Sequence, residues 1–327
     1  MSLYNYIISE QNIYLAIYSL KSYIYDKHLL SKEDIMLYEK LLDPFNENVT
    51  NQVISDVRKI IENIIKNDNT YFDVQVYFIP KSYDVKSKDA EDKKAKFRPI
   101  HIADIRQLIA MVSMFQVIIY DIPNEQNQYR LNLSDYCRLI PYNFYGNKIS
   151  PQVGNLYMNW NTQYSKFVEK SNRFFREGRD FGKYKFEVKL DIINFFPSVN
   201  PILIYGLLLE HMPVTIMDQA DVDVFKKVIY KLIKCKINNL NTSEVIERYY
   251  DSADTNTGDY FTRGLPQGLP QSYFFGNLCM VKIADIISET LKGDSLYYVD
   301  DVYVYTNIDI ENENSFNQYL FTINDKM

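Results

Sequence analysis

The chain has 327 residues, which is enough for a large hydrophobic core and for two or three subdomains. Its 46% hydrophobic and 24% charged residues are typical of a soluble globular protein, and we find no internal repeat and no low-complexity tract. The net charge of −6 argues against a passive nucleic-acid coat. It does not argue against an enzyme that binds nucleic acid through a local basic surface.

The sequence also limits where the protein is found. No run of about 18 uncharged apolar residues is present, so we expect no membrane span and no membrane partner. The N-terminal residues MSLYNYIISEQ lack the basic start and apolar core of a signal peptide. The three cysteines, Cys137, Cys235 and Cys279, are widely spaced and suggest a reducing compartment. We therefore expect a cytoplasmic protein.

The first third of the chain is predicted to be mainly helical. Residues 1–70 look helical because apolar residues recur at helical spacing between Val53 and Ile65. Residues 74–79, VQVYFI, have strand composition, and we expect this strand to end at Pro80. A buried helix should follow and end at Pro123.

A basic segment separates this strand from the buried helix. Lys93, Lys94, Lys96 and Arg98 lie within six residues of one another. Such runs are usually solvated loops, but they can also clamp phosphates through charge-assisted hydrogen bonds. The residues alone leave both interpretations open.

The middle of the chain carries two further signals. Residues 136–149 mix turn and aromatic residues, and Gly146 would allow a close approach of backbone. Residues 151–182 are polar with helical stretches. Residues 185–191, KFEVKLD, alternate between apolar and charged side chains, which predicts a half-buried strand ending at Asp191. Asp191 is either a site carboxylate at a strand end or the cap of a helix that begins nearby.

The last part of the chain is predicted to contain helices and a hairpin. Residues 199–240 should form two helices, and a Pro/Gly loop from Gly264 to Gln271 should lead into a helix capped by Ser272. The final stretch, SFNQYLFTINDKM, also reads as a helix. Residues 296–306, LYYVDDVYVYT, are typical of a tight β-hairpin.

The tip of this hairpin carries Asp300 and Asp301. Tight turns normally use Asn-Gly or Asp-Gly, and neighbouring aspartates add repulsion. A divalent cation would explain the pair, because carboxylate oxygens suit Mg²⁺. A solvated hairpin tip is the alternative.

Four segments, taken in this order, resemble the reverse transcriptases, and the resemblance spans roughly residues 75–306. Lys96-Phe97-Arg98-Pro99-Ile100 is similar to the basic fingers segment of that family. Asp191 to Val199, DIINFFPSV, resembles the first palm motif, in which an aromatic residue follows five positions after an aspartate. Leu265 to Ser272, LPQGLPQS, resembles the template and nucleotide loop, and Tyr298-Val299-Asp300-Asp301 resembles the YxDD box.

The resemblance implies an α+β fold with the fingers and palm of a right-hand polymerase. The palm would be an antiparallel sheet with helices, preceded by a helical N-terminal region. We expect the helical region at 1–70, the fingers at 71–182 and the palm at 183–327, with part of the fingers–palm connection at 200–262. We expect the thumb or C-terminal domain of the family to be absent from this chain.

The implied activity is nucleotidyl transfer from dNTPs with two Mg²⁺ ions, for which Mn²⁺ could substitute. The family pattern assigns catalysis to Asp191, Asp300 and Asp301. It assigns metal binding to Asp191, Ile192 and Asp300, and it ranks Asp300 above Asp301 as a direct ligand.

The same resemblance assigns nucleotide binding to Lys94, Lys96, Arg98, Phe196, Gln267 and Ser272. Phe196 would be a steric gate whose ring leaves no room for a 2′-hydroxyl. Gln267 would contact the incoming nucleotide, and Ser272 would support its loop. Arg98 would hold the triphosphate together with Lys96 or Lys94, and the choice between the two lysines stays open.

The segment Leu139–Ile149 and the long helical N-terminus are most similar to bacterial abortive-infection and other defence-associated reverse transcriptases. This implies RNA-directed or template-independent DNA synthesis in antiphage defence. Its partners would be dNTPs, a DNA product and, in some relatives, an RNA template, a protein primer or further copies of the chain. The alternatives are a catalytically silent palm scaffold or regulatory protein, a templated enzyme of the retron or group II intron type, and an RNA polymerase. Phe196 argues against the last.

Overall fold

The computed structural model describes residues 2–27, 29–82, 96–121, 131–212, 217–238, 252–254 and 259–327. The chain is a mixed protein of helices and strands, which confirms the α+β class. Its contacts divide it into two compact units: unit 1 is Met1–Val117 with Phe196–Ser272, and unit 2 is Ile118–Phe195 with Tyr273–Met327. Each unit is thus built from two stretches of chain, whereas the sequence suggested three consecutive ranges.

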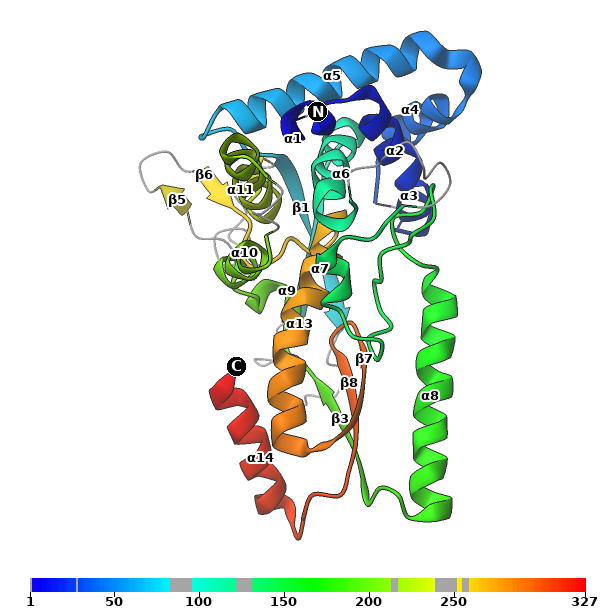
Figure 1. Ribbon diagram of the computed structural model, residues 1–327, viewed down its shortest axis with the longest axis vertical. Coiled ribbons are helices and arrows are strands. Elements are labelled where there is room, and N and C mark those ends of the chain that lie inside the picture. Colours follow the sequence, from blue (N-terminus) through cyan, green and yellow to red (C-terminus); the bar gives the residue numbers. More distant parts are fainter. Residues whose placement is uncertain are drawn as a thin grey trace, which may run out of the picture. The chain divides into compact units, whose positions relative to one another are not determined.

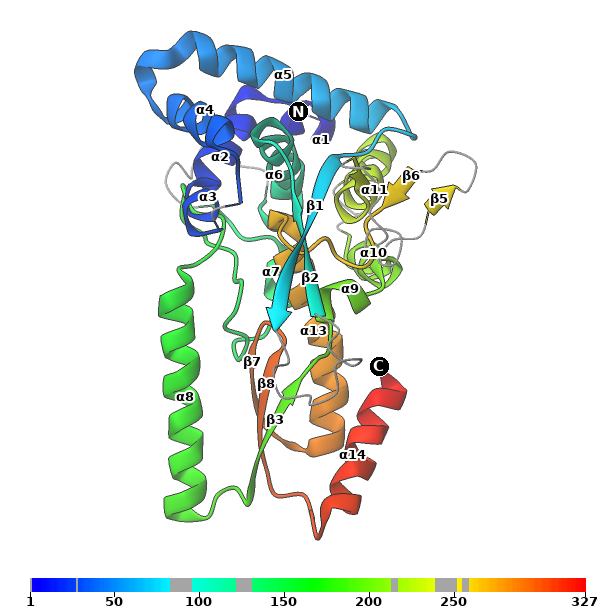
Figure 2. The same cartoon turned by 180° about the vertical axis from the view of Figure 1, so that it is seen from behind.

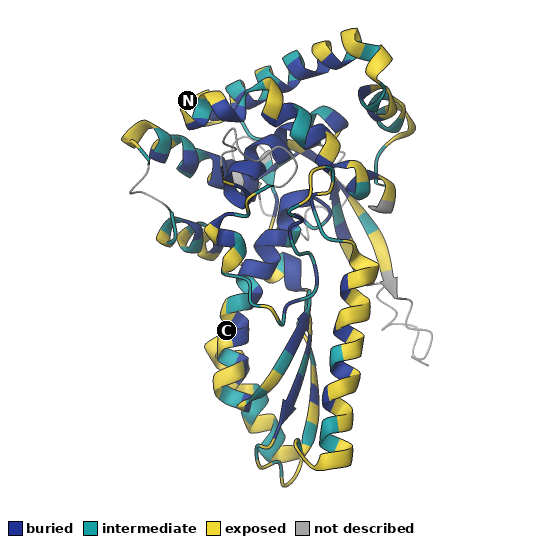
Figure 3. Cartoon of the chain, turned by 45° about the vertical axis from the view of Figure 1, so that its right-hand side comes forward, coloured by how far each residue is buried: buried dark blue, intermediate teal, exposed yellow. Residues whose placement is uncertain are grey.

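Unit 1 is mainly helical in its N-terminal stretch, as predicted. Its helices are α1 (Leu3–Ile7), α2 (Glu10–Ser19), α3 (Lys21–Lys27), α4 (Lys32–Leu42), η1 (Pro44–Asn46), α5 (Glu47–Lys66), most of α6 (Ile105–Ile119), α10 (Pro201–Glu210) and α11 (Gln219–Ile233). Ser9 and Ser31 cap α2 and α4 by accepting backbone N–H groups. The apolar face predicted for α5 is buried, and α6 is buried along nearly its whole length (Figure 3).

The sheet of unit 1 has five strands in the order β2-β1-β4-β6-β5. They are β1 (Asp73–Ser82), β2 (Lys96–Ile102), β4 (Lys236–Ile237), β5 (Ser252–Asp254) and β6 (Asp259–Phe261). β1 pairs in parallel with β4, and the other pairs are antiparallel. Figure 2 shows β1 and β2 as a long two-stranded ladder.

The predicted ends of β1 and α6 are wrong. β1 continues through Pro80 to Ser82. Pro80 is tolerated because β4 pairs only with the start of β1 and the ladder to β2 is irregular between Pro80 and Ser82. α6 ends at Ile119, and Tyr120 instead bridges to Leu133. Pro123, the predicted end, lies outside the described residues.

Unit 2 is built on an antiparallel sheet of three strands in the order β3-β8-β7. Its strands are β3 (Phe186–Asp191), β7 (Gly293–Tyr298) and β8 (Asp301–Thr306), and its helices are α7 (Asp135–Arg138), α8 (Trp160–Phe181), most of α13 (Pro270–Leu291) and α14 (Glu313–Lys326). A short helix, α9 (Phe195–Ser198), spans the boundary between the units. Figures 1 and 2 show α8 on one side of this sheet and α13 with α14 on the other. The strand ending at Asp191, the tight hairpin and the last helix are confirmed.

The helix after the Pro/Gly loop begins earlier than predicted. α13 starts at Pro270, so Ser272 lies in its first turn and is not its N-cap. Proline suits the first helical position because it has no N–H to leave unpaired there.

One face of the three-stranded sheet is covered by α8 through aromatic packing. Phe167 and Phe174 on α8 form a buried cluster with Leu296 and Tyr305. The ring of Phe167 lies 5.6 Å from that of Tyr298, measured between centroids. The hairpin is therefore held against a long helix along most of its length.

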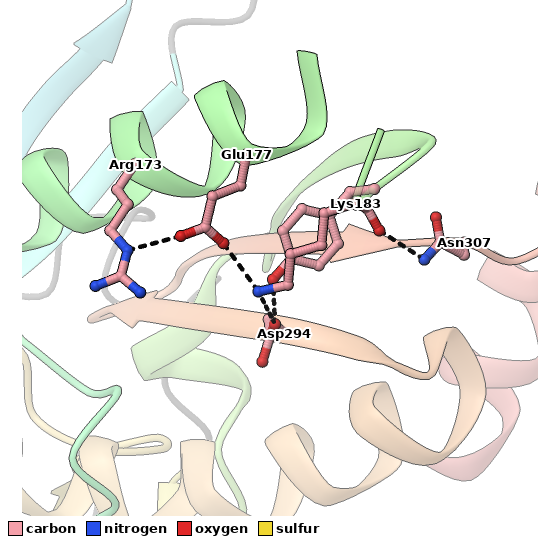
Figure 4. A network of polar contacts seen from close by, with 6 residues as sticks. Arg173, Glu177, Lys183, Asp294 and Asn307 are labelled. Carbon is pink, nitrogen blue, oxygen red and sulfur yellow. Dashed lines mark hydrogen bonds and ion pairs between the residues drawn. The ribbon is translucent and has the colours of Figure 1, made fainter. Parts of the chain in front are cut away.

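The far end of the hairpin is joined to α8 by polar contacts at the surface (Figure 4). The carboxylate of Glu177 accepts from Arg173 and from Lys183, each at 2.8 Å. These partners, Lys183 first, lower the pKa of Glu177 to about 2. Lys183 Nζ also lies 3.7 Å from Asp294 Oδ2 at the start of β7. Asn307 Nδ2 donates to the carbonyl of Lys183 at 2.8 Å.

Within the described part of the chain, no helix has the length and apolar character needed to span a membrane.

Candidate functional site

Two of the predicted carboxylates face each other across the sheet of unit 2. β3 and β8 pair in a register that sets Asp191 directly opposite Asp301. Residues opposite each other in antiparallel strands point to the same face, with Cβ atoms about 4.5–5.5 Å apart. Both residues are exposed. The fold thus brings together residues more than one hundred positions apart in sequence.

The third carboxylate lies in the turn. Tyr298 pairs with Asp301, so Val299 and Asp300 are the two residues of the hairpin loop. Val299 has φ 58°, a left-handed conformation that is a clear outlier for a β-branched residue. Asp300 has negative φ, which gives the pattern of a type II′ turn, where glycine is usual at the first loop position. The tip is therefore strained, and strain of this kind clusters at functional sites.

The electrostatics of the tip are unfavourable without a cation. Loss of hydration, the charge of Asp300 and the charge of Asp191 together raise the pKa of Asp301 above its ordinary value. Within the described residues, no lysine or arginine forms an ion pair with Asp191 or Asp301. Lys189, on the same face of β3, lies over the ring of Tyr303 with Nζ 4.6 Å from its centroid. The fold thus concentrates negative charge at this point of the sheet.

The oxygen donors at the tip fit Mg²⁺ chemically. In the described ranges, no three His, Cys, Asp or Glu side chains are grouped as a ready-made metal site. Mg²⁺ does not require such a group, because it is commonly held by one or two carboxylates, water and substrate phosphates. Asp191 and Asp301 supply two carboxylates on one face. Ile192 has no side-chain donor, so only its carbonyl could bind a cation. The ranking of Asp300 above Asp301 stays a prediction.

The nucleotide-binding residues predicted near the Pro/Gly loop are brought together within unit 1. Leu265 N donates to the carbonyl of Phe196 at 2.9 Å. A Cβ at Gly264 would lie 2.3 Å from that same oxygen, and φ there is +63°, so this position requires glycine. The side chain of Phe196 is 6% exposed. The loop is thereby fixed against the residue predicted to be the gate.

His101 on β2 anchors the same loop, and no pattern in the sequence predicted this role. Its backbone N–H donates to the carbonyl of Gln267 at 2.7 Å, and its Nδ1 lies 3.1 Å from that oxygen. Since a carbonyl only accepts, the contact requires a proton on Nδ1. A Cβ at Gly268 would lie 2.4 Å from the carbonyl of His101. The main chain of Gln267 therefore has a defined position beside β2.

The structure describes only some of the other residues predicted to bind the nucleotide. Arg98 is exposed on β2, opposite Ile79. Lys96 begins β2, but its side chain is not described, and Lys94 lies outside the described residues. Ser272 is buried, and its Oγ has no hydrogen-bond partner among the described residues.

Asp301→Asn should stabilise the metal-free protein. Because the pKa of Asp301 is raised by folding, its ionisation opposes folding as pH rises through the ordinary aspartate range. Removing a like charge from a cross-strand pair should raise the free energy of unfolding by about 0.2–1 kcal/mol at pH 7. The gain should vanish below about pH 4, where the carboxyl is protonated in both states. Urea unfolding in EDTA, followed by circular dichroism, measures this. Asp325→Asn on α14 is the matched control, and a destabilised Asp301→Asn protein would contradict the repulsion.

Acid should weaken unit 1 through His101. Burial lowers the pKa of His101 to about 4, so between pH 6.5 and pH 4 the unfolded chain binds a proton that the folded chain does not. The stabilisation is complete above pH 6.5 and is lost on acidification, by about 2 kcal/mol between pH 8 and pH 5. The difference between the urea midpoints at pH 8 and pH 5 should be smaller in His101→Gln than in the unchanged protein. His211→Gln, at the end of α10, is the control and should keep the full difference. An unchanged pH dependence in His101→Gln would show that the acid sensitivity arises elsewhere.

A scan against protein-family models and a search of curated proteins both found no match for this chain.

Proposed function

We propose that the chain is a Mg²⁺-dependent nucleotidyltransferase, a DNA polymerase of the reverse-transcriptase type that uses dNTPs. The observation that carries the proposal is the pair of Asp191 and Asp301, opposite each other on one sheet face, with Asp300 in the strained turn beside them. Like charges in this arrangement oppose folding. A divalent cation would convert that repulsion into attraction, which gives a physical reason for the arrangement.

The residues at the tip would hold the metal through carboxylate oxygens of Asp191, Asp300 and Asp301 and the carbonyl of Ile192. When bound, Mg²⁺ stabilises charge on the attacking and leaving oxygens of an in-line displacement at phosphorus. The chain's own contribution is placement. The ladder between β3 and β8 fixes the separation of two carboxylates, and the two-residue turn fixes the third. A backbone fixed in this way supports charge stabilisation at the tip.

The residues proposed to select the nucleotide belong to unit 1. Phe196 is buried and five positions beyond Asp191 in the chain, which supports a role for its ring beside the sugar. The main chain of Gln267 is held in place by the hydrogen bond from His101 to its carbonyl. This fixed position supports a contact between the loop and the nucleotide. Arg98, exposed on β2, is the described candidate for the triphosphate. We propose a cytoplasmic role in antiphage defence from the resemblance of residues 139–149 and of the long helical N-terminus, which is an argument by analogy.

Incorporation of labelled dNTPs tests the activity. The purified protein with Mg²⁺ should incorporate nucleotide, and Asp191→Asn and Asp300→Asn should each reduce the rate by about 100-fold or more, because each removes a charge that places the metal. Asp325→Asn is the control and should retain full activity. Running each dNTP singly, with and without an RNA template and primer, separates templated from template-independent synthesis. Label that stays on the protein after denaturation would indicate protein priming. No incorporation by folded protein under any condition would instead favour a catalytically silent scaffold.

Phe196→Ala should relax the choice of sugar. Loss of the ring would open space for a 2′-hydroxyl, so the ratio of ribonucleotide to deoxyribonucleotide incorporation should rise about tenfold or more, a change of about 1.4 kcal/mol in discrimination. The ratio is the right measurement because partial unfolding lowers both rates equally. Phe195→Ala, the same change at the neighbouring buried position, should leave the ratio unchanged. Unchanged selectivity in Phe196→Ala would remove the gate assignment.

A further inference from the structure

A short segment of unit 2, Asn143–Asn147, runs alongside β7 as an additional strand-like element. Tyr145 N donates to the carbonyl of Tyr297 at 2.9 Å, and Tyr297 N donates to the carbonyl of Asn143 at 3.0 Å. The rings of Phe144 and Tyr297 stack with centroids 4.5 Å apart. These contacts pair the segment with β7 just before the turn. We call Asn143–Asn147 the brace.

The brace ends directly against the strained turn. A Cβ at Gly146 would lie 2.7 Å from both the backbone N and the Cγ2 of Val299. Carbon atoms do not approach backbone nitrogen this closely, so any larger residue would push the turn away. Because the obstacle is backbone, the clash cannot be relieved by a side-chain rotation alone. Gly146 therefore permits the close contact that confines Val299.

A buried amide fixes the brace from the other side. Asn277 on α13 is 2% exposed, and its Nδ2 donates to the carbonyl of Gly146 at 2.7 Å and to that of Asn147 at 3.1 Å. Asn147 has φ 50°, a left-handed conformation that asparagine tolerates better than most residues. The two hydrogen bonds hold the brace at the point where it reverses direction next to Val299.

We propose that the brace and Asn277 position the carboxylates of Asp300 and Asp301 by holding Val299 in its strained conformation. A residue in such a conformation persists only where its surroundings force it, and Gly146 and Asn277 provide those surroundings. They are positioning residues, since neither carries a group for the reaction. The inference rests on the proposed function, because the placement matters for binding Mg²⁺ at the tip.

Metal binding, measured apart from activity, tests the role of Gly146. Mn²⁺ is the probe, and its free concentration in titrations of the full chain is followed by electron paramagnetic resonance. Gly146→Ala should weaken Mn²⁺ binding by about tenfold or more, because displacement of the turn moves Asp300 relative to Asp191. Gly206→Ala on α10 is the matched control, since nothing lies within 4 Å of its new Cβ, and binding should be unchanged.

A second glycine separates positioning from general loosening of the hairpin. A Cβ at Gly293 would lie 2.3 Å from the carbonyl of Tyr305, at the opposite end of the same strands. Gly293→Ala should therefore lower the unfolding midpoint but leave Mn²⁺ affinity intact at temperatures where the protein is folded. If Gly293→Ala weakens binding as much as Gly146→Ala does, the brace has no specific role.

Variants of Asn277 provide the independent check. Asn277→Leu keeps the approximate size but loses the donor, and it should weaken Mn²⁺ binding. Asn277→Gln keeps an amide donor and should restore part of the affinity. Equal affinity in the unchanged protein, Gly146→Ala and Asn277→Leu would overturn the inference while leaving the proposed function standing. If the unchanged protein binds no Mn²⁺, or binds it as well after Asp191→Asn, the proposed metal site fails, and the brace loses its role with it.

Discussion

The pairing of β3 with β8 is the constraint on which the site depends. Hydrogen bonding between these strands sets the register, and the register sets Asp191 opposite Asp301. Side chains alternate between faces, so a slip of one residue would turn every carboxylate of one strand to the opposite face. The buried residues of the hairpin resist such a slip, because the exposed Asp301 and the half-buried Tyr303 would move to the face on which Val302 and Val304 are buried. Packing of the hydrophobic core therefore fixes the geometry of an exposed, charged site.

At the hairpin tip, contacts with neighbouring residues outweigh the conformational preference of the local backbone. A valine in the left-handed region costs about 1–3 kcal/mol, and glycine would avoid that cost. The neighbouring segment supplies the contacts that make the conformation persist: a glycine where the backbones touch and a buried amide that holds two carbonyls. The arrangement uses glycine in the supporting segment and not in the turn, so the turn keeps a side chain that restricts its conformations.

Local patterns predicted the elements of the site but not their contacts. Alternation predicted β3 and its end at Asp191, and composition predicted the hairpin, since both depend on residues adjacent in sequence. The carboxylate opposite Asp191 could not be predicted, because it depends on whether the turn has two residues or more. The contact of His101 with Gln267 joins distant segments, and nothing in the flanking residues indicates it. A close backbone approach was predicted at Gly146, but its partner Val299 was not, because the two residues are distant in the chain. The strand was wrongly predicted to end at Pro80. A proline can lie within β1 because β4 pairs only with the start of that strand, and the sequence around Pro80 does not indicate how far β4 extends.

The two ends of the hairpin are held by different forces. At the tip, backbone hydrogen bonds and close packing hold Tyr297 and Val299, and dissolved ions screen neither. At the far end, the contacts of Glu177, Lys183 and Asp294 lie at the surface, where ion pairs contribute little and salt weakens them. Rising ionic strength would therefore weaken the polar contacts at the end remote from the aspartates, where the packing of Phe174 against Tyr305 would remain. The charged tip would keep its register in solutions of very different salt content.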